Sequence, residues 1–159
     1  MHEEESQVNP MNKPYQRKGV SSNTAVGKAF EAKAKAFFSA EGIELQNSIP
    51  AKVGINGKKI HKFDLGNDEQ KILVECKSHR WTEGGNIPSA KIRAWNEAMY
   101  FFYIAPKAYR KIFFVLRDYS PKKKETLASF YVRTSSHLIP KDVEIWEYDE
   151  KRNTVEKMK

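Results

Sequence analysis

Three side chains in the first half of this chain are spaced to hold a divalent metal ion. Asp64 stands at the end of one predicted strand, and Glu75 and Lys77 leave the next strand on one face, because side chains alternate along a strand. Cys76, between them, points to the opposite face, and the apolar run 72–74 is typical of a buried strand. Desolvating opposite charges at one place is costly, and binding a divalent ion is a physical reason to do so.

The spacing Asp64…Glu75-Cys76-Lys77 resembles the Asp…(Asp/Glu)-x-Lys signature of the restriction-endonuclease-like PD-(D/E)XK nuclease superfamily. Upstream, Gly27-Lys28-Ala29-Phe30-Glu31 is similar to the Gly-x-x-x-Glu helix that many members place before the core sheet. The resemblance covers roughly residues 27–117. Phe63 stands where the proline of the signature would be, a position at which many members also lack proline.

The resemblance implies a site for Mg²⁺, with Mn²⁺ as a substitute. Asp64 and Glu75 would be ligands, the backbone carbonyl of Cys76 a third, and Glu31 a further one, directly or through water. Oxygen ligands suit a hard cation, which would activate water for phosphodiester hydrolysis. Lys77 would orient or deprotonate the attacking water, or stabilise charge on the phosphorus, and the sequence does not choose among these roles.

Simpler interpretations exist for the same residues. Glu75 and Lys77 also fit a surface ion pair at a strand end, which is common and contributes about 0–1 kcal/mol. Glu31 also fits an i,i+4 helix pair with Lys35. Because Asp64 and Glu31 accompany the Glu-x-Lys triplet, we favour the metal site.

Candidate nucleic-acid contacts follow the triplet along the chain. Arg80 is a candidate for holding a phosphate, and Trp81 either stacks on a base or folds back onto the core. Lys91 and Arg93 either line a substrate groove or belong to a solvated helix face. A basic run near the third predicted helix is either part of a phosphate track or a solvated surface: Lys122, Lys123 and Lys124.

Composition narrows the class of protein. The chain has 159 residues and a net charge of +8, which favours a polyanionic partner such as nucleic acid. A single cysteine excludes an internal disulfide and fits a reducing, cytoplasmic location. No apolar run approaches the roughly 20 residues of a membrane span, so we expect no membrane association.

The chain reads as one α/β domain, with residues 1–22 as a mobile basic arm, 23–150 as the nuclease domain and 151–159 as a polar tail. We expect a restriction-endonuclease-like core with a mixed central sheet flanked by helices, in the order α-β-β-β-α-β with a C-terminal α-β extension. The predicted strands and helices are listed here: a helix from Asn23 or Thr24 to Gly42, strands 43–49, 58–65 and 71–77, a helix from Pro88-Ser89, strand 111–117, a helix from Ser120-Pro121, and a short strand near 143–146.

The expected function is a Mg²⁺-dependent DNA endonuclease of the restriction or mobile-element type, acting on duplex or branched DNA. A single small site reaches one strand, so double-strand cleavage implies a homodimer. A Holliday-junction-resolving nuclease, a catalytically inactive DNA-binding subunit of the same fold and an RNA-directed nuclease are the alternatives.

Overall fold

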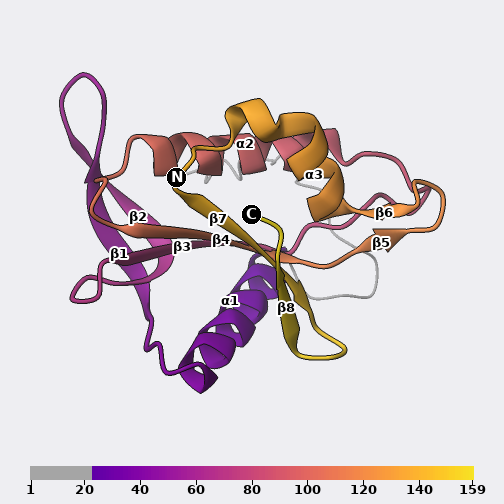
Figure 1. Ribbon diagram of the computed structural model, residues 1–159, viewed down its shortest axis with the longest axis horizontal. Helices are drawn as coiled ribbons and strands as arrows, with labels where there is room; N and C mark the ends of the chain where they lie inside the picture. Colours follow the sequence, from indigo (N-terminus) through magenta and orange to yellow (C-terminus); the bar gives the residue numbers. More distant parts are fainter. Residues whose placement is uncertain (1–22) are drawn as a thin grey trace, which may run out of the picture.

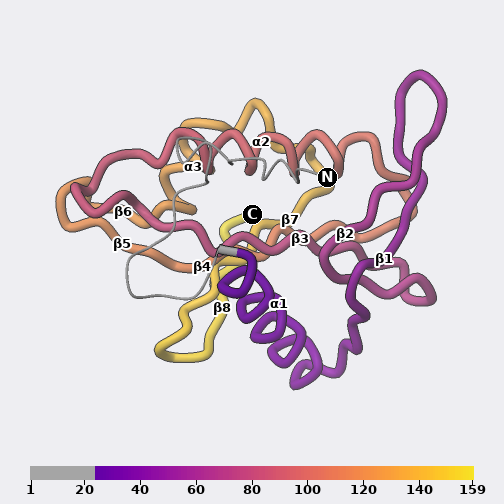
Figure 2. The backbone as a smooth tube through the Cα atoms, turned by 180° about the vertical axis from the view of Figure 1, so that it is seen from behind, coloured from indigo at the N-terminus to yellow at the C-terminus, as the bar shows by residue number. Residues whose placement is uncertain are grey.

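A mixed β-sheet with helices on both faces forms the folded part of the chain (Figures 1 and 2). The computed structural model describes residues 23–159, so the predicted arm 1–22 lies outside the described residues. The helices are α1 (Asn23–Ala40), α2 (Ser89–Tyr103), α3 (Leu127–Ser135) and the short 3-10 helix η2 (Ser136–Leu138). The strands are β1 (Gln46–Val53), β2 (Lys59–Asn67), β3 (Ile72–Lys77), β4 (Arg110–Leu116), β5 (Tyr119–Ser120), β6 (Glu125–Thr126), β7 (Val143–Asp149) and β8 (Thr154–Lys157).

The main sheet has six strands in the order β1-β2-β3-β4-β7-β8, and β5 pairs with β6 in a separate ribbon. The first three strands are antiparallel neighbours, whereas β3, β4 and β7 run parallel in the centre. Parallel neighbours need crossover connections, and α2 and α3 supply them. The predicted α/β architecture with a mixed, helix-flanked sheet is confirmed.

The two faces of the sheet are covered by different helices. Figure 1 shows α1 on one side and α2 with α3 on the other. Strand β4 is buried on both faces, since Phe113 and Val115 pack in the cluster under α2 and α3 while Ile112 and Phe114 pack against α1. Within residues 23–159, no helix combines the length and apolar character that a membrane crossing demands.

Strands β1 and β2 bend together where they leave the sheet. Phe63 packs in the cluster under α2, but Leu65, two residues on, packs in the cluster against α1. Regular alternation would place both on one face, so the strand switches faces at Asp64. Ser48 lies opposite Asp64 in the ladder, between the pairs Asn47↔Leu65 and Ile49↔Phe63. Its φ of 55° is in the left-handed region. The bend therefore places an acid at the point where the hairpin departs from β3.

The predicted start of the third helix is wrong. Ser120 ends β5, its hydroxyl accepts the backbone N–H of Lys123, and the chain turns back into β6. Helix α3 begins only at Leu127, where the Thr126 hydroxyl accepts the backbone N–H of Ser129. The Ser-Pro pair is thus part of a turn, and threonine is the helix cap.

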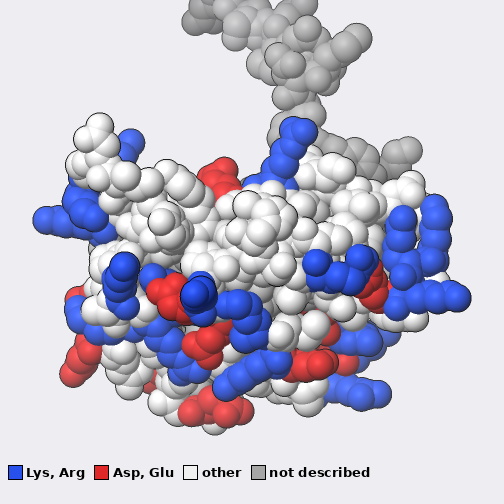
Figure 3. All heavy atoms as spheres, turned by 45° about the horizontal axis from the view of Figure 1, so that its top comes forward, with Lys and Arg blue, Asp and Glu red and all other residues white. Residues whose placement is uncertain are grey.

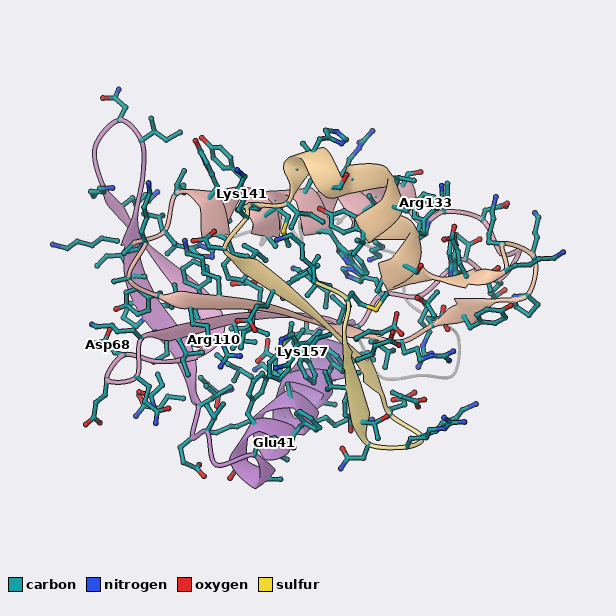
Figure 4. All side chains as sticks on the ribbon, viewed as in Figure 1. Glu41, Asp68, Arg110, Arg133, Lys141 and Lys157 are labelled. Carbon is teal, nitrogen blue, oxygen red and sulfur yellow. The ribbon has the colours of Figure 1, made fainter. Side chains whose placement is uncertain are left out.

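The predicted polar tail 151–159 contains strand β8, which pairs antiparallel with β7. The cations of Arg110 and Lys157, both labelled in Figure 4, lie 5.6 Å and 4.6 Å from the ring centroid of Trp146. Val155 also packs against the α1-facing cluster. These contacts extend the folded domain beyond residue 150.

The bend at Ser48 generates a stability prediction. Ser48→Val should have a free energy of unfolding about 2 kcal/mol below that of Ser48→Gly, because a β-branched side chain is strained at positive φ. Urea unfolding monitored by tryptophan fluorescence measures both values. Equal stability of the two variants would contradict a left-handed Ser48.

Candidate active site

Strand β3 carries Glu75, Cys76 and Lys77 to its carboxyl end, between β2 and β4. Leu73 packs in the cluster under α2, and Cys76 packs in the cluster against α1. By strand alternation, Glu75 and Lys77 share the face of Leu73. The two charged side chains therefore leave β3 on one side of the sheet.

The carboxylate of Asp64 lies against the backbone of β3. Its Oδ2 accepts the backbone N–H of Cys76 at 2.9 Å. The β2–β3 register ends at the pair Leu65↔Val74, so the backbone N–H of Cys76 has no acceptor on the backbone of β2. The Asp64 carboxylate accepts this N–H instead. This bond holds Asp64 beside the triplet that β3 delivers.

Glu75 is buried without full hydrogen bonding. The residue is 7% exposed, and its Oε1 has no hydrogen-bond partner among residues 23–159. Nε2 of His61 lies 3.6 Å from Oε1, beyond hydrogen-bond distance, and the imidazole is stacked on Phe101 at 3.7 Å between ring centroids. A buried carboxyl oxygen without a partner is expensive, so the surface ion pair does not describe this residue.

The environment of Glu75 favours its protonated form in the absence of a cation. Burial raises the pKa of Glu75 to about 7, and the charge of Asp64 and a hydrogen bond with its carboxyl act in the same direction. The interactions with His61 and Lys77 lower that pKa. A cation between the two carboxylates would reverse this preference.

Glu31 reaches the same site from α1. Burial raises its pKa, the negative charge of Asp64 raises it further, and the positive charge of Lys77 opposes both. Lys35, the alternative partner of Glu31 on the helix, instead donates to Oδ1 of Asn47 at 3.0 Å. The structure thus brings Glu31 into electrostatic contact with Asp64 and Lys77.

These residues fit a hard divalent ion. Asp64 and Glu75 offer carboxylate oxygens, and the carbonyl of Cys76 is part of the same strand end. The Cys76 thiol points away, and burial raises its pKa well above the ordinary value, so the sulfur is no ligand. Among residues 23–159, no three His, Cys, Asp or Glu side chains form a metal-binding group by themselves. Mg²⁺ commonly takes only one or two carboxylates and keeps several waters, so two carboxylates and a carbonyl suffice.

The structure corrects the stacking role predicted for Trp81. The residue is 8% exposed, and its ring packs edge-on against Phe130 in the cluster under α2. Its indole N–H donates to the backbone oxygen of Asp118 at 2.9 Å, and its backbone N–H donates to the Asp118 carboxylate at 2.8 Å. Trp81 therefore follows the second alternative and folds back onto the core.

Arg80 is held by carboxylates of the protein. Its guanidinium donates to Asp118 at 3.3 Å and to Glu150 at 2.9 Å, and Lys33 of α1 contacts Glu150 at 3.2 Å. These contacts join the loop after β3 to β7 and α1. The phosphate-binding role predicted for Arg80 would require breaking two ion pairs, so the structure favours a positioning role.

The other predicted nucleic-acid contacts lie on the surface. Lys91 and Arg93 are exposed on the first turns of α2. Lys122 donates to the carbonyl of Gly84 and to Asn86, which ties the β5–β6 turn to the loop before α2. Figure 3 shows Lys and Arg side chains gathered at two ends of one face, over this turn and over the β1–β2 hairpin. Lys123 and Lys124 are exposed beside Lys122.

Sequence reasoning missed His61 and the lysines of the β1–β2 hairpin. His61 precedes Asp64 on β2 by three positions, and only the bend of that strand brings its ring beside Glu75. The positive charge of the hairpin could have been recognised in the sequence, because residues 49–63 contain four lysines and no acidic residue.

Comparisons with known proteins find no matching family model, curated protein or solved structure. The function of the site therefore has to be inferred from the chemistry of its own residues.

The buried Glu75 generates a pH prediction for the metal-free protein. Folding raises the pKa of Glu75 from 4.5 to about 7, so the folded state favours the protonated carboxyl. This contribution to the free energy of unfolding is complete below pH 4.5 and is lost as the pH rises through 7. The free energy of unfolding of Glu75→Gln, relative to that of the wild type, should therefore rise by about 2 kcal/mol from pH 5 to pH 8. Urea unfolding in EDTA at each pH measures the difference. Parallel pH profiles for the two proteins would contradict a desolvated Glu75 carboxyl.

Proposed function

We propose that this protein is a Mg²⁺-dependent DNA endonuclease with a restriction-endonuclease-like core. One observation carries the proposal: a buried carboxyl, Glu75, has an oxygen without a hydrogen-bond partner among residues 23–159, beside a second carboxyl, Asp64, at a strand end that also bears Lys77. A structural ion pair gives no reason to leave that oxygen unpaired, whereas a cation site does.

The topology supports the same proposal. The chain order α1, β1, β2, β3, α2, β4 matches the order expected from the resemblance, and β7 follows through α3. The three site residues of the signature lie on β2 and β3, and Glu31 lies on α1, close enough for the charges of Asp64 and Lys77 to act on its carboxyl. The net charge of +8 suits a polyanionic substrate.

Each residue has a separable task in this proposal. Asp64, Glu75 and the Cys76 carbonyl would hold the ion, and Glu31 would contribute from α1, directly or through water. A bound Mg²⁺ would supply Lewis-acid activation of a water molecule and offset charge on the phosphate. Lys77 donates a hydrogen bond to the attacking water or to a phosphate oxygen and adds positive charge beside the scissile bond.

One protomer carries one such site, which serves one strand of a duplex. We propose a homodimer for cleavage of both strands, since a two-fold axis matches the symmetry of duplex DNA. An inactive DNA-binding subunit is the less favoured alternative, because the carboxylate and lysine set is complete.

We expect Mg²⁺-dependent cleavage of DNA that EDTA abolishes and Ca²⁺ does not support. Supercoiled, linear and four-way branched DNA, with RNA as a fourth substrate, identify the form that is cut. Glu75→Gln and Lys77→Ala should each lower the cleavage rate by at least about a hundredfold, while binding measured in Ca²⁺ stays. Glu69→Gln, in the exposed β2–β3 turn, is the matched control and should cleave normally.

Two results would contradict the endonuclease. Cleavage that continues in chelator would exclude the metal site, and full activity of Glu75→Gln would exclude its central ligand. A lack of cleavage on every substrate, together with tight DNA binding, would identify the inactive binding subunit instead. Urea unfolding of Glu75→Gln in the cleavage buffer separates loss of a metal ligand from loss of folding.

A further inference from the structure

The β1–β2 arm, defined as residues 49–63, projects from the body of the protein. Figures 1 and 2 show the turn of this hairpin projecting beyond the end of α2, while its strands β1 and β2 belong to the sheet. Its inner face is packed, with Ile49, Val53 and Phe63 in the cluster under α2. The backbone N–H of Gly54 also donates to the carbonyl of Ile104 at 3.2 Å. The arm is therefore a firmly seated ribbon.

The arm carries uncompensated positive charge. Residues 49–63 hold four lysines and no Asp or Glu. Four exposed side chains make up this charge: Lys52, Lys58, Lys59 and Lys62. None of them forms an ion pair with a carboxylate of residues 23–159, whereas Arg80, Arg110 and Arg133 do. Unpaired lysines on a projecting ribbon attract a polyanion and gain affinity by releasing its counterions.

Two isoleucines stand among these lysines. Ile55, at the turn, is 71% exposed, and Ile60, on β2 opposite Lys52, is 60% exposed. A β-branched apolar side chain at the end of a rigid ribbon contributes nothing to the core. Proteins that bind the minor groove commonly insert such a residue between base pairs, beside phosphate-binding lysines.

We propose that the β1–β2 arm binds duplex DNA, with its lysines on the phosphates and Ile55 inserted between base pairs. The presence of exposed lysines around the two isoleucines favours DNA over a protein partner, because an apolar protein contact would bury unpaired charges. Lys52 and Lys62 lie on the outer face of the arm, and Lys62 precedes Asp64 by two residues on β2. The arm and the candidate metal site therefore share strand β2.

The reach of the arm sets where the insertion occurs. From Asp64 back to Asn56 at the turn, extended strand spans at most about 26 Å. At about 3.4 Å per base step, Ile55 falls within about eight base pairs of the scissile phosphate. The DNA would be unstacked at a fixed distance from the cut.

The choice of DNA rests on the proposed function, but the test does not require cleavage. Full-length protein is titrated in Ca²⁺ into a fluorescent duplex at several salt concentrations, and into duplexes carrying 2-aminopurine, which brightens when unstacked. Lys52→Gln/Lys62→Gln should lower the slope of log K against log salt by about two, since two phosphate contacts are lost. The matched control Lys151→Gln/Arg152→Gln removes the same charge from the distant β7–β8 turn and should bind as the wild type (Figure 1).

Ile55→Ser should abolish the rise in 2-aminopurine emission, while Ile87→Ser, at an exposed isoleucine outside the arm, should retain it. The proposal is overturned if the arm variants match their controls in both measurements. It is also overturned if Ile55→Ser leaves the emission unchanged and alters the sedimentation of the DNA-free protein, because the turn would then contact a second copy. If the arm binds DNA but the protein does not cleave it in Mg²⁺, the proposed endonuclease activity is contradicted and the proposed role of the arm is not. If cleavage occurs and the arm variants do not affect it, the proposed role of the arm is contradicted and the endonuclease activity is not.

Discussion

The desolvation of one carboxyl group dominates the chemistry of this protein. Glu75 sits at the end of a buried central strand, and one of its oxygens has no hydrogen-bond partner among the described residues. The carboxyl of Asp64 lies beside it. Each feature disfavours the charged form in a metal-free protein. A hard cation would satisfy this oxygen and offset the repulsion between the two acids, which is the physical basis of the metal site that we propose.

The bend of β1 and β2 makes this site possible. A regular β2 would continue the ladder past Leu65 and keep Asp64 within the pleat. Ser48 in the left-handed region and the change of face at Asp64 divert the hairpin, so that the Asp64 carboxylate meets the backbone of Cys76. The same bend directs the arm away from the sheet, which links the position of the acid to the surface that we propose for DNA.

Local patterns along the chain predicted the β2–β3 hairpin and the helices before and after it, and the resemblance added the mixed sheet. The placement of Glu75 and Lys77 on one face of β3 followed from strand alternation. Period-2 alternation sufficed for β3, because its face does not change. It failed for β2, since a strand that switches faces hides the partnership of His61 with Glu75. The sequence left the two alternatives for Trp81 open and did not reveal the ion pairs of Arg80, because their partner, Asp118, lies 37 and 38 residues further along the chain and only tertiary packing brings it near. The helix expected at Ser120 failed for a local reason, as Ser-Pro also opens turns.

A crystal grown with Mn²⁺ and measured at the manganese absorption edge tests the central claim most directly. The account predicts one anomalous peak at coordination distance from the carboxylates of Asp64 and Glu75 and from the carbonyl of Cys76, with the Lys77 ammonium close by. A crystal with Mn²⁺ bound elsewhere, or with the Glu75 oxygen hydrogen-bonded to protein and no peak beside it, would contradict the account.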